Sequence, residues 1–204
     1  ITFGREVWFD SEQGINVTPQ KRQLGYVFQD YTLFPHLNLY ENAAFAAVDK
    51  KEVDDLFDLL RIGHLKKRKP HMVSGGERQR CAICQALARH PRLLLLDEPF
   101  SNLDAMHKST IKTVIHDIGI KMNISCILVS HEAADTLSWA DLILVLKDGQ
   151  LIQQGTPEQV YKQPVNEYCA GLFGDYNLVD SKTASVLGAN SEMIEMNQPL
   201  LIRP

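Results

Sequence analysis

The sequence predicts an α/β fold with a parallel β-sheet, followed by the start of a smaller β-rich unit. Residues 93–96 are four consecutive leucines, an unbroken apolar run typical of a strand covered on both faces. Similar runs at 24–28 and 126–129 are separated from it by helical patterns, as the crossover connections of a parallel sheet require. Beyond Gly174 this alternation stops, and short strand-like pieces stand between polar turns.

The N-terminal half is expected to supply two strands and three helices before the leucine run. In order, these are strands at 6–9 and 24–28 and helices at 38–48, 52–62 and 77–90. The second helix is expected to end at Gly63, because a left-handed helix cap suits glycine.

The C-terminal half is expected to continue with a helix, a strand, a hairpin and two short helices. In order, these are the helix 105–122, the strand 126–129, the hairpin strands 142–146 and 151–154, and the helices 157–163 and 166–173. Asp148-Gly149 is the turn signal of the hairpin. We therefore expect one domain over 1–173, with a helical subdomain at about 36–90, and the start of a β-rich domain over 174–204, with strand-like pieces at 175–181, 192–196 and 200–202.

Composition excludes several classes of protein. The chain has 21 Lys+Arg and 25 Asp+Glu, so its net charge of -4 gives no general attraction to nucleic acid. The basic run 66–69 favours a solvated helix end over a phosphate-binding patch. The apolar runs fall far short of the roughly 20 residues that a membrane helix needs.

Four cysteines are present, and only Cys81 and Cys84 have a C-x-x-C spacing. No second pair is available to complete a zinc site. Because this pair lies within a helical pattern, small core residues are favoured over redox chemistry, and a reducing compartment fits the cysteine usage.

Residues 74–77, Ser-Gly-Gly-Glu, predict a capped helix start. Ser74 and Glu77 have the spacing of a capping box, in which each side chain satisfies a free backbone amide. Gly75 and Gly76 remove side chains from that helix start, so an anion could approach its amides. A cap and a phosphate site are both consistent with this tetrad.

Polar groups follow three of the expected strands. Asp97 and Glu98 follow the leucine run, Gln29 follows 24–28, and His131 follows 126–129. Ligands bind at the carboxyl ends of strands in open parallel sheets, although an acidic pair can also cap a helix and a lone histidine is usually structural. On the functional interpretation Asp97 holds Mg2+ and Glu98 polarises a water, while Gln29 can bridge metal and water.

With these motifs in this order, residues 1–173 resemble an ATP-binding-cassette (ABC) ATPase, the motor subunit of an ABC transporter. The resemblance lies in five segments: the Q-loop at 26–29, the signature motif at 73–80, the Walker B strand with its catalytic glutamate at 93–98, the D-loop at 101–104 and the switch histidine His131. It implies a P-loop NTPase-like fold with a parallel sheet core and a helical signature subdomain.

The resemblance also implies roles for individual residues in ATP hydrolysis at a head-to-tail dimer. These roles are catalysis for Glu98 and His131, metal binding for Asp97 and Gln29, contact with the partner's ATP for Ser74, Gly75, Gly76 and Glu77, dimer contacts for Ser101, Asn102, Leu103 and Asp104, and docking to membrane subunits for Tyr31, Phe34 and Pro35. The cofactors implied are ATP and Mg2+.

The implied partners are a second ATPase subunit, most simply another copy, transmembrane permease subunits and, indirectly, a solute-binding protein. No nucleic-acid partner is expected. The implied location is the cytoplasmic face of a bacterial-type membrane, and the tail resembles importers of polyamines, ferric iron, molybdate or sulfate. Two alternatives stay open: a soluble ABC ATPase without a transport role, and an inactive interaction module.

One part of the family pattern is missing. The chain contains no G-x-x-x-x-G-K-[ST] sequence, the Walker A loop that cradles phosphates. We therefore expect a chain truncated before its signature-bearing part, unable to hold ATP in its own site and exposing apolar surface on its sheet. Residues 196–204 resemble the opening of a small β regulatory domain.

Overall fold

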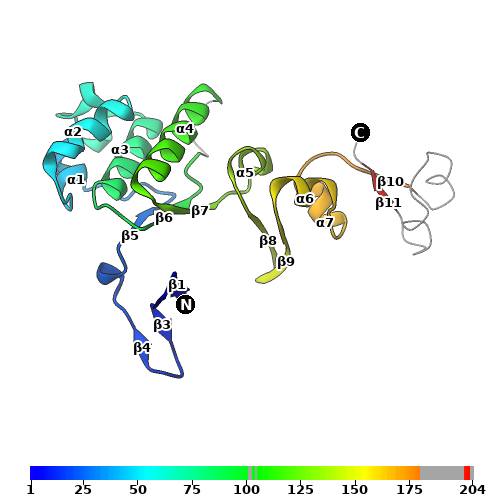
Figure 1. Ribbon diagram of the computed structural model, residues 1–204. Coiled ribbons are helices and arrows are strands. Elements are labelled where there is room, and N and C mark those ends of the chain that lie inside the picture. Colours follow the sequence, from blue (N-terminus) through cyan, green and yellow to red (C-terminus); the bar gives the residue numbers. More distant parts are fainter. Residues whose placement is uncertain (101–102, 104, 180–199, 203–204) are drawn as a thin grey trace. The chain divides into compact units, whose positions relative to one another are not determined.

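A computed structural model describes residues 1–100, 103, 105–179 and 200–202. The chain divides into two compact units, Ile1–Val129 and Ser130–Pro204 (Figure 1). Among the described residues, no helix combines the length and hydropathy needed to cross a bilayer.

Two small hairpins open the first unit. β1 (Thr2–Phe3) pairs with β2 (Glu6–Val7), and β3 (Phe9–Asp10) pairs with β4 (Ile15–Asn16), all antiparallel. The single strand predicted over 6–9 is therefore wrong. It is interrupted at Trp8, whose ring is buried and stacks on Phe3 with centroids 4.9 Å apart, so the chain turns there to start a second hairpin.

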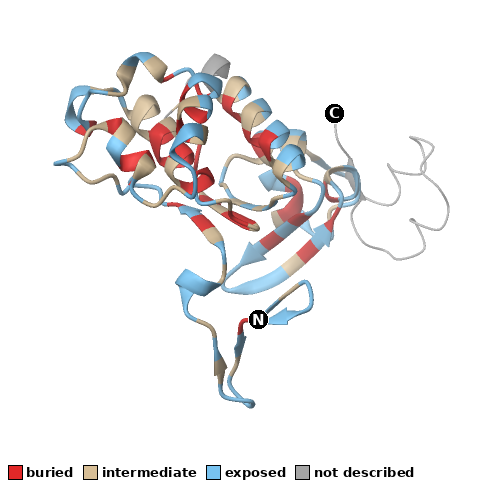
Figure 2. Cartoon of the chain, turned by 60° about the vertical axis from the view of Figure 1, so that its left-hand side comes forward, coloured by how far each residue is buried: buried red, intermediate tan, exposed pale blue. Residues whose placement is uncertain are grey.

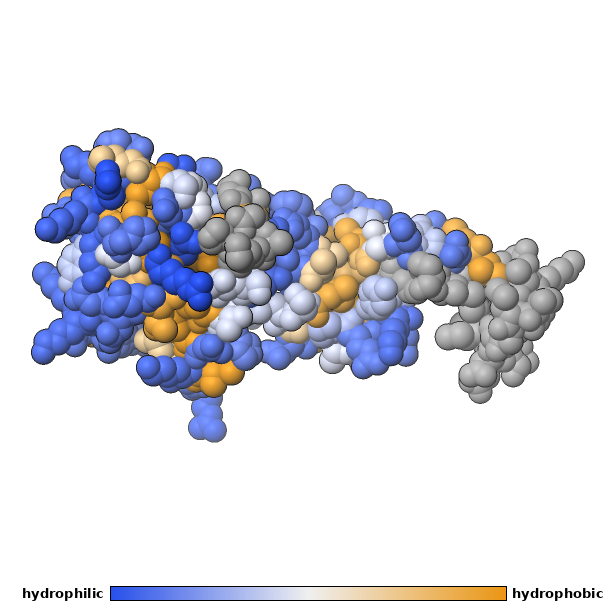
Figure 3. Space-filling view, turned by 90° about the horizontal axis from the view of Figure 1, so that it is seen from above, coloured by the Kyte–Doolittle hydropathy of each residue, from blue (hydrophilic) through white to orange (hydrophobic). Residues whose placement is uncertain are grey.

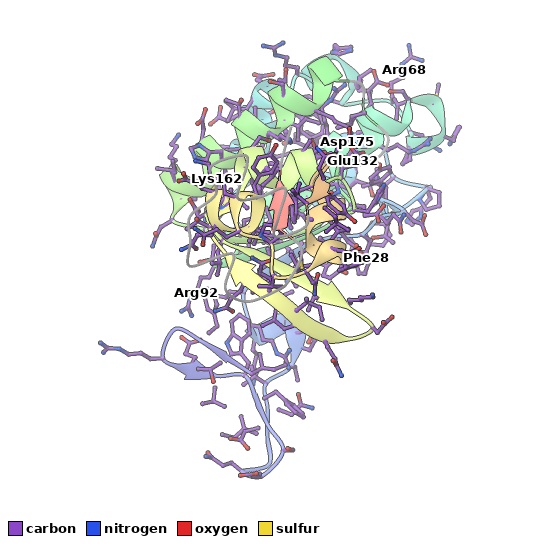
Figure 4. All side chains as sticks on the ribbon, turned by 90° about the vertical axis from the view of Figure 1, so that its right-hand side faces the viewer. Phe28, Arg68, Arg92, Glu132, Lys162 and Asp175 are labelled. Carbon is purple, nitrogen blue, oxygen red and sulfur yellow. The ribbon has the colours of Figure 1, made fainter. Side chains whose placement is uncertain are left out.

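Arg92 ties these hairpins to the main sheet (Figure 4). Its guanidinium donates to Glu6 Oε1 at 2.7 Å and lies 5.3 Å from the centre of the Phe3 ring. Its backbone N–H donates to Gln23 O, and its carbonyl accepts from Ser125 N. Arg92 therefore joins the first hairpin to the starts of the three strands that follow.

The predicted parallel sheet is confirmed. Its strands are β5 (Leu24–Val27), β6 (Leu93–Asp97) and β7 (Ser125–Val129), in the order β5-β6-β7. Figure 1 shows helices α1 to α4 gathered on one side of this sheet. On that side Gly25 lets α3 approach closely, because an ideal Cβ at Gly25 would lie 3.0 Å from the carbonyl oxygen of Ala86.

The opposite face of the sheet carries exposed apolar side chains. Tyr26, Ile127 and Val129 are 39%, 53% and 56% exposed. Leu95 shares the register of Tyr26 and Ile127 and is half-buried, so the leucine run is fully covered on one face and not on both as predicted. The exposed apolar surface expected from the sequence is present.

Four helices and three 3-10 turns complete the first unit. The α-helices are α1 (Leu39–Ala44), α2 (Lys50–Leu59), α3 (Gly75–Leu87) and α4 (Ala105–Met122), and the 3-10 turns are η1 (Pro19–Lys21), η2 (Gly63–Leu65) and η3 (Pro70–Met72). The side chains of Asn38, Asp49 and Ser74 cap α1, α2 and α3. Figure 2 shows buried positions on these helices, and in α3 the consecutive residues 81–84 are all buried, so this helix is covered on most sides.

The predicted glycine cap at Gly63 is wrong. The residue with left-handed backbone after α2 is Arg61, with φ 55°, and Gly63 instead begins η2. Gly63 is explained by a close approach, since an ideal Cβ there would lie 2.5 Å from Asp58 Oδ1.

The first unit packs its core around α3, which contacts α1, α2 and β5. Phe57, Ile83 and Leu96 are among its fully buried side chains. Cys81 and Cys84 are buried in this core, and the Cys81 thiol donates to Leu39 O at 3.3 Å. Burial raises the pKa of Cys81 to about 12 and that of Cys84 further, so the interpretation of this pair as core residues is confirmed.

The second unit is built on one hairpin. Its elements are α5 (Ala133–Trp139), β8 (Ile143–Lys147), β9 (Gln150–Gly155), α6 (Pro157–Lys162), α7 (Glu167–Leu172), β10 (Asn177–Val179) and β11 (Leu200–Ile202). The β8–β9 turn has positive φ at Asp148 and Gly149, as the Asp-Gly signal predicts. Ile143 and Val145 form its core with Val160 and Cys169.

Two further expectations concern the C-terminal region. β10 and β11 pair antiparallel, which agrees with strand-like pieces near 175–181 and 200–202. The piece expected at 192–196 lies outside the described residues. The domain boundary expected at residue 173 stays a prediction.

Candidate functional site

Two of the predicted catalytic and metal-binding residues meet at one edge of the sheet. Gln29, two residues beyond β5, donates from Nε2 to Glu98 Oε2 at 3.2 Å, and Glu98 directly follows β6. The Glu98 backbone N–H donates to Val129 O at 2.9 Å, which holds this turn against the end of β7. The site therefore lies at the carboxyl ends of the three parallel strands, as predicted.

Glu98 has a left-handed backbone, with φ 47°. A non-glycine residue adopts this region at an energetic cost, and it persists where the surroundings fix it. Here the Gln29 side chain and the Val129 carbonyl supply part of that fixation. The carboxylate is thus presented from a strained turn and not from a regular strand end.

Asp97 has a partner that the sequence did not point out. The Tyr26 hydroxyl donates to Asp97 Oδ2 at 3.4 Å, and the Tyr26 ring packs on Phe28 with centroids 4.1 Å apart. Partial burial of the phenol and the neighbouring Asp97 charge raise the pKa of Tyr26. The contact follows from the parallel register, which puts Tyr26 beside Leu95, on the sheet face that also carries Asp97.

The donor set at this edge suits a magnesium ion that is also held by phosphates. Asp97 provides a carboxylate and Gln29 an amide oxygen, both hard oxygen ligands. Mg2+ is usually bound by one or two carboxylates together with substrate phosphates and water. In the part of the chain that is described, no cluster of three His, Cys, Asp or Glu residues forms an all-protein metal cage.

The start of α3 is a complete capping box. Ser74 Oγ accepts from Glu77 N at 3.3 Å, and Glu77 Oε2 accepts from Ser74 N at 2.8 Å. The hydrogen bond from the Ser74 backbone lowers the pKa of Glu77. The capping role predicted for Ser74 and Glu77 is therefore present. The case for an anion-binding site at this helix start depends on Gly75 and Gly76.

The glycines leave the outside of this helix start open. Near an ideal Cβ on Gly75, Arg78 Nη2 lies 3.9 Å away, which is ordinary van der Waals distance. A Cβ on Gly76 would lie 2.7 Å from Leu103 Cδ2. Packing within the chain therefore restricts residue 76 but not residue 75, whereas an approaching anion would need both positions small.

Arg78 fixes the chain that leads into this turn. Its Nη1 donates to the carbonyls of Pro70 and Val73 at 3.4 and 3.3 Å. Arg78, a residue of α3, thus stabilises the turn that connects η3 to α3.

The D-loop residues are only partly described. Ser101, Asn102 and Asp104 lie outside the described residues. Leu103 is half-buried, its backbone N–H donates to Phe100 O at 3.3 Å, and its side chain packs against Gly76. The segment after Glu98 and the signature turn therefore touch within the first unit.

His131 lies two residues beyond β7, is exposed, and belongs to the second unit. The structure does not test the prediction that it joins Asp97 and Glu98.

The expected docking loop is held by one buried side chain, Asn42. The Phe34 N–H donates to Asn42 Oδ1 at 2.7 Å, and Asn42 Nδ2 lies within hydrogen-bond distance of the carbonyls of Phe34, Leu37 and Asn38. Asn42 is fully buried. The loop before α1 is therefore a fixed surface.

Within that loop the three predicted docking residues differ in exposure. Tyr31 is buried, Phe34 is half-buried and Pro35 is exposed. Phe45, which sequence reasoning missed, is 66% exposed and packs on Phe34 with ring centroids 4.8 Å apart. Tyr31 thus supports the loop from beneath, and hydrophobic patches interrupt the mostly hydrophilic surface of this unit (Figure 3).

Comparison with known proteins places the chain beside ABC transporter subunits. A family model described as ABC transporter matches residues 4–101. The chain is 36% identical over 189 residues to the spermidine/putrescine import ATP-binding protein PotA of Thermotoga maritima, covering 89% of this chain and 51% of that protein. It is 40% identical over 177 residues to the Fe(3+) ions import ATP-binding protein FbpC 2 of Pectobacterium atrosepticum, covering 84% and 51%.

The chain spans about half the length of the curated relatives it matches. Among solved structures, cbiO1 from Clostridium perfringens, part of the ABC transporter complex cbiONQ, matches with a TM-score of 0.63 and 31% identity. That match covers 70% of this chain and 61% of the other. The matches and the shared fold therefore show an ABC transporter ATPase domain in this chain, with a parallel sheet and helices as in cbiO1.

Proposed function

We propose that this chain is the ATP-hydrolysing motor subunit of an ABC importer. The observation that carries the proposal is the Gln29–Glu98 hydrogen bond at the carboxyl edge of the parallel sheet. It prepares a carboxylate beside an amide that can bridge a metal ion and a water. An interaction module without catalysis has no physical need for this pair on a strained turn.

In this proposal Glu98 polarises the attacking water, while Asp97 and Gln29 hold Mg2+ bound to the nucleotide phosphates. General-base assistance of this kind contributes roughly 10²- to 10⁴-fold to a rate. His131 is assigned the role of second catalytic group on its sequence motif alone. Phosphoryl transfer to water depends mainly on such positioning and charge neutralisation.

The signature turn acts on the nucleotide of a second subunit, most simply another copy of the chain. Ser74, Gly75, Gly76 and Glu77 present a helix start without side chains in the way, where backbone amides and the helix dipole favour phosphate. The D-loop residues Ser101, Asn102, Leu103 and Asp104 join the two sites. ATP is thus held between two subunits arranged head to tail.

Import is the direction suggested by the relatives, whose names concern spermidine/putrescine and Fe(3+) ions. In the proposal the loop at Tyr31, Phe34 and Pro35 docks to transmembrane permease subunits at the cytoplasmic face of the membrane. Those subunits and a solute-binding protein select the cargo. Phe45 extends this apolar surface.

The printed chain itself is proposed not to hold ATP in its own site. Its sequence contains no G-x-x-x-x-G-K-[ST] loop, so the backbone cradle for the β- and γ-phosphates is missing. Equilibrium binding of a fluorescent ATP analogue tests this. Micromolar affinity of the printed chain for the analogue would contradict it.

A two-component experiment tests the signature role. A loop-bearing copy, called here the complete copy, is made by fusing to Ile1 a strand–loop–helix segment that contains the G-x-x-x-x-G-K-[ST] sequence, and its own signature is blocked by Gly76→Asp. The only composite site then consists of ATP on the complete copy and the signature turn of the printed chain. ATP-dependent association and hydrolysis are expected, and Glu98→Gln in the complete copy should abolish hydrolysis but not association.

A matched pair of variants separates anion binding from helix capping. Ser74→Ala in the printed chain should abolish ATP-dependent association. Thr156→Ala removes an equivalent capping box from α6 in the second unit and should leave association intact. Each loses about 1 kcal/mol of stability as a cap. Equal association by both variants would refute a phosphate role for Ser74.

A further inference from the structure

Gln79 is a buried polar side chain without a partner. It is 0% exposed, and neither its Nε2 nor its Oε1 has a hydrogen-bond partner among the described residues. Buried amides are nearly always paired, because leaving one unpaired forfeits its hydration without compensation. An apolar residue of similar size would fit this core position better, so the amide requires an explanation.

The direction of the side chain follows from the geometry of α3. At 100° per residue, Gln79 points between the directions of Gly76 and Ala86. Gly76 packs against Leu103, and Ala86 packs against Gly25 on β5. Along the helix axis Gln79 lies about 4.5 Å from Gly76 and about 10.5 Å from Ala86. It therefore faces the end of the sheet where the chain leaves β6.

The segment at that end is the turn that carries the water-activating carboxylate. Glu98 has a left-handed backbone, and its side chain is held by Gln29. Phe100, two residues on, is 1% exposed and accepts from Leu103 N. The direction of the side chain along α3 thus points the buried amide toward this turn, in the same unit.

We propose that Gln79 is a positioning residue that couples these two turns. When the signature turn engages ATP held by a second subunit, the Gln79 amide hydrogen-bonds the backbone of the Glu98–Phe100 turn, with Nε2 donating and Oε1 accepting. Within the described part of the chain the amide has no partner, so pairing it favours the engaged state. This inference rests on the proposed function.

The coupling runs between two different ATP sites. The signature turn of one subunit touches the partner's nucleotide, while Glu98 of that subunit acts on its own. Gln79 would make each subunit's hydrolysis depend on whether its signature turn is occupied. Such a link is reciprocal, so ordering of the Glu98 turn would also favour signature engagement.

Hydrogen exchange of the printed chain tests the coupling directly. The chain is measured alone and bound to the ATP-loaded, signature-blocked complete copy. On binding, exchange of the Phe100 amide should slow by about 10-fold, the effect of one neutral hydrogen bond, whereas the Glu98 amide already donates to Val129 O and should change little. In the Gln79→Leu variant the slowing should be absent, and by reciprocity affinity for the complete copy should fall by up to about 10-fold, the worth of that one bond.

The free chain provides the second readout. Gln79→Leu removes an unpaired amide and adds apolar contact, so its urea midpoint should equal or exceed that of the unmodified chain. Gln85→Leu is the matched control, a half-buried glutamine about 120° around α3 from Gln79, and should retain the slowed exchange. A lower midpoint for Gln79→Leu would show a purely structural role and overturn the inference.

The remaining outcomes are also decisive. Slowed exchange that persists in Gln79→Leu, or an unmodified chain that associates without any slowing, overturns the coupling alone. An unmodified chain that does not associate with the ATP-loaded copy overturns the proposed function and the coupling with it.

Discussion

Replacing Asn42 should release the loop that is proposed to dock to the membrane subunits. Asn42 accepts from Phe34 N at 2.7 Å and places Nδ2 within 3.3 Å of three carbonyls, those of Phe34, Leu37 and Asn38. Asn42→Ala removes all of these interactions from a fully buried position. The Phe34 N–H would then lose its acceptor, and the carbonyls would lose their bonds from Nδ2, although Phe34 O and Asn38 O would each keep a backbone donor.

The size of the effect can be worked out from this geometry. Nδ2 carries two hydrogens, so at most two of its three carbonyl contacts are made at full strength at one time. With the bond from Phe34 N, three hydrogen bonds are lost, each worth about 1 kcal/mol. We expect Asn42→Ala to lower the free energy of unfolding by about 3 kcal/mol, a large part of the 5–15 kcal/mol typical of a folded domain.

Urea denaturation followed by circular dichroism measures this loss. The midpoint should fall while the slope stays constant, because the surface exposed on unfolding changes little. Asn177→Ala, at an exposed asparagine in β10 of the second unit, is the control and should change stability by less than about 0.5 kcal/mol. A loss below about 1 kcal/mol for Asn42→Ala would refute the counting of three buried hydrogen bonds.

Three other predictions follow from features of the first unit. The folded-state pKa of Glu77 is lowered, so its charged cap stabilises the fold fully above the unfolded pKa of about 4.5, and this stabilisation is lost as the pH falls through the folded pKa. Glu77→Gln should therefore flatten the acid side of a plot of stability against pH. An unchanged acid side would contradict this. The exposed Ile127 and Val129 should bind a hydrophobic dye, with Ile127→Thr reducing the fluorescence, and a dye-silent native chain would count against the bare sheet face. Cys81 and Cys84 should react with a thiol reagent only as fast as the chain unfolds, because burial raises the pKa of both, and rapid labelling without denaturant would contradict their burial.

The sheet and most helices were predictable because their patterns are strong and local. The leucine run 93–96 and the Asp148-Gly149 turn each dictate one structure. Trp8 was not predictable in the same way, since its burial against Phe3 depends on a tertiary contact that splits one apparent strand into two hairpins. α5 was missed because its polar and small residues give no clear apolar stripe.

The candidate site divides in the same manner. Gln29 and Glu98 could be predicted because both follow apolar strands, and parallel strands bring their ends together. The bond between Tyr26 and Asp97 depends on the strand register, which the sequence does not specify. The burial of Gln79 could not be predicted from hydrophobic periodicity, because glutamine is mostly a surface residue, whereas Gln79 is fully buried.

Anion binding restricts the residue at position 74 more strongly than helix capping does. The hydroxyl accepts from Glu77 N with a lone pair, so its own hydrogen is left to donate to an anion. Aspartate caps helices about as well as serine, but it accepts only and would bring a second negative charge toward a phosphate. Ser74→Asp would therefore yield a chain that is as stable as the original but does not bind phosphate. The hydroxyl hydrogen of Ser74 is needed for anion binding and not for capping, so the two functions can be separated at this residue.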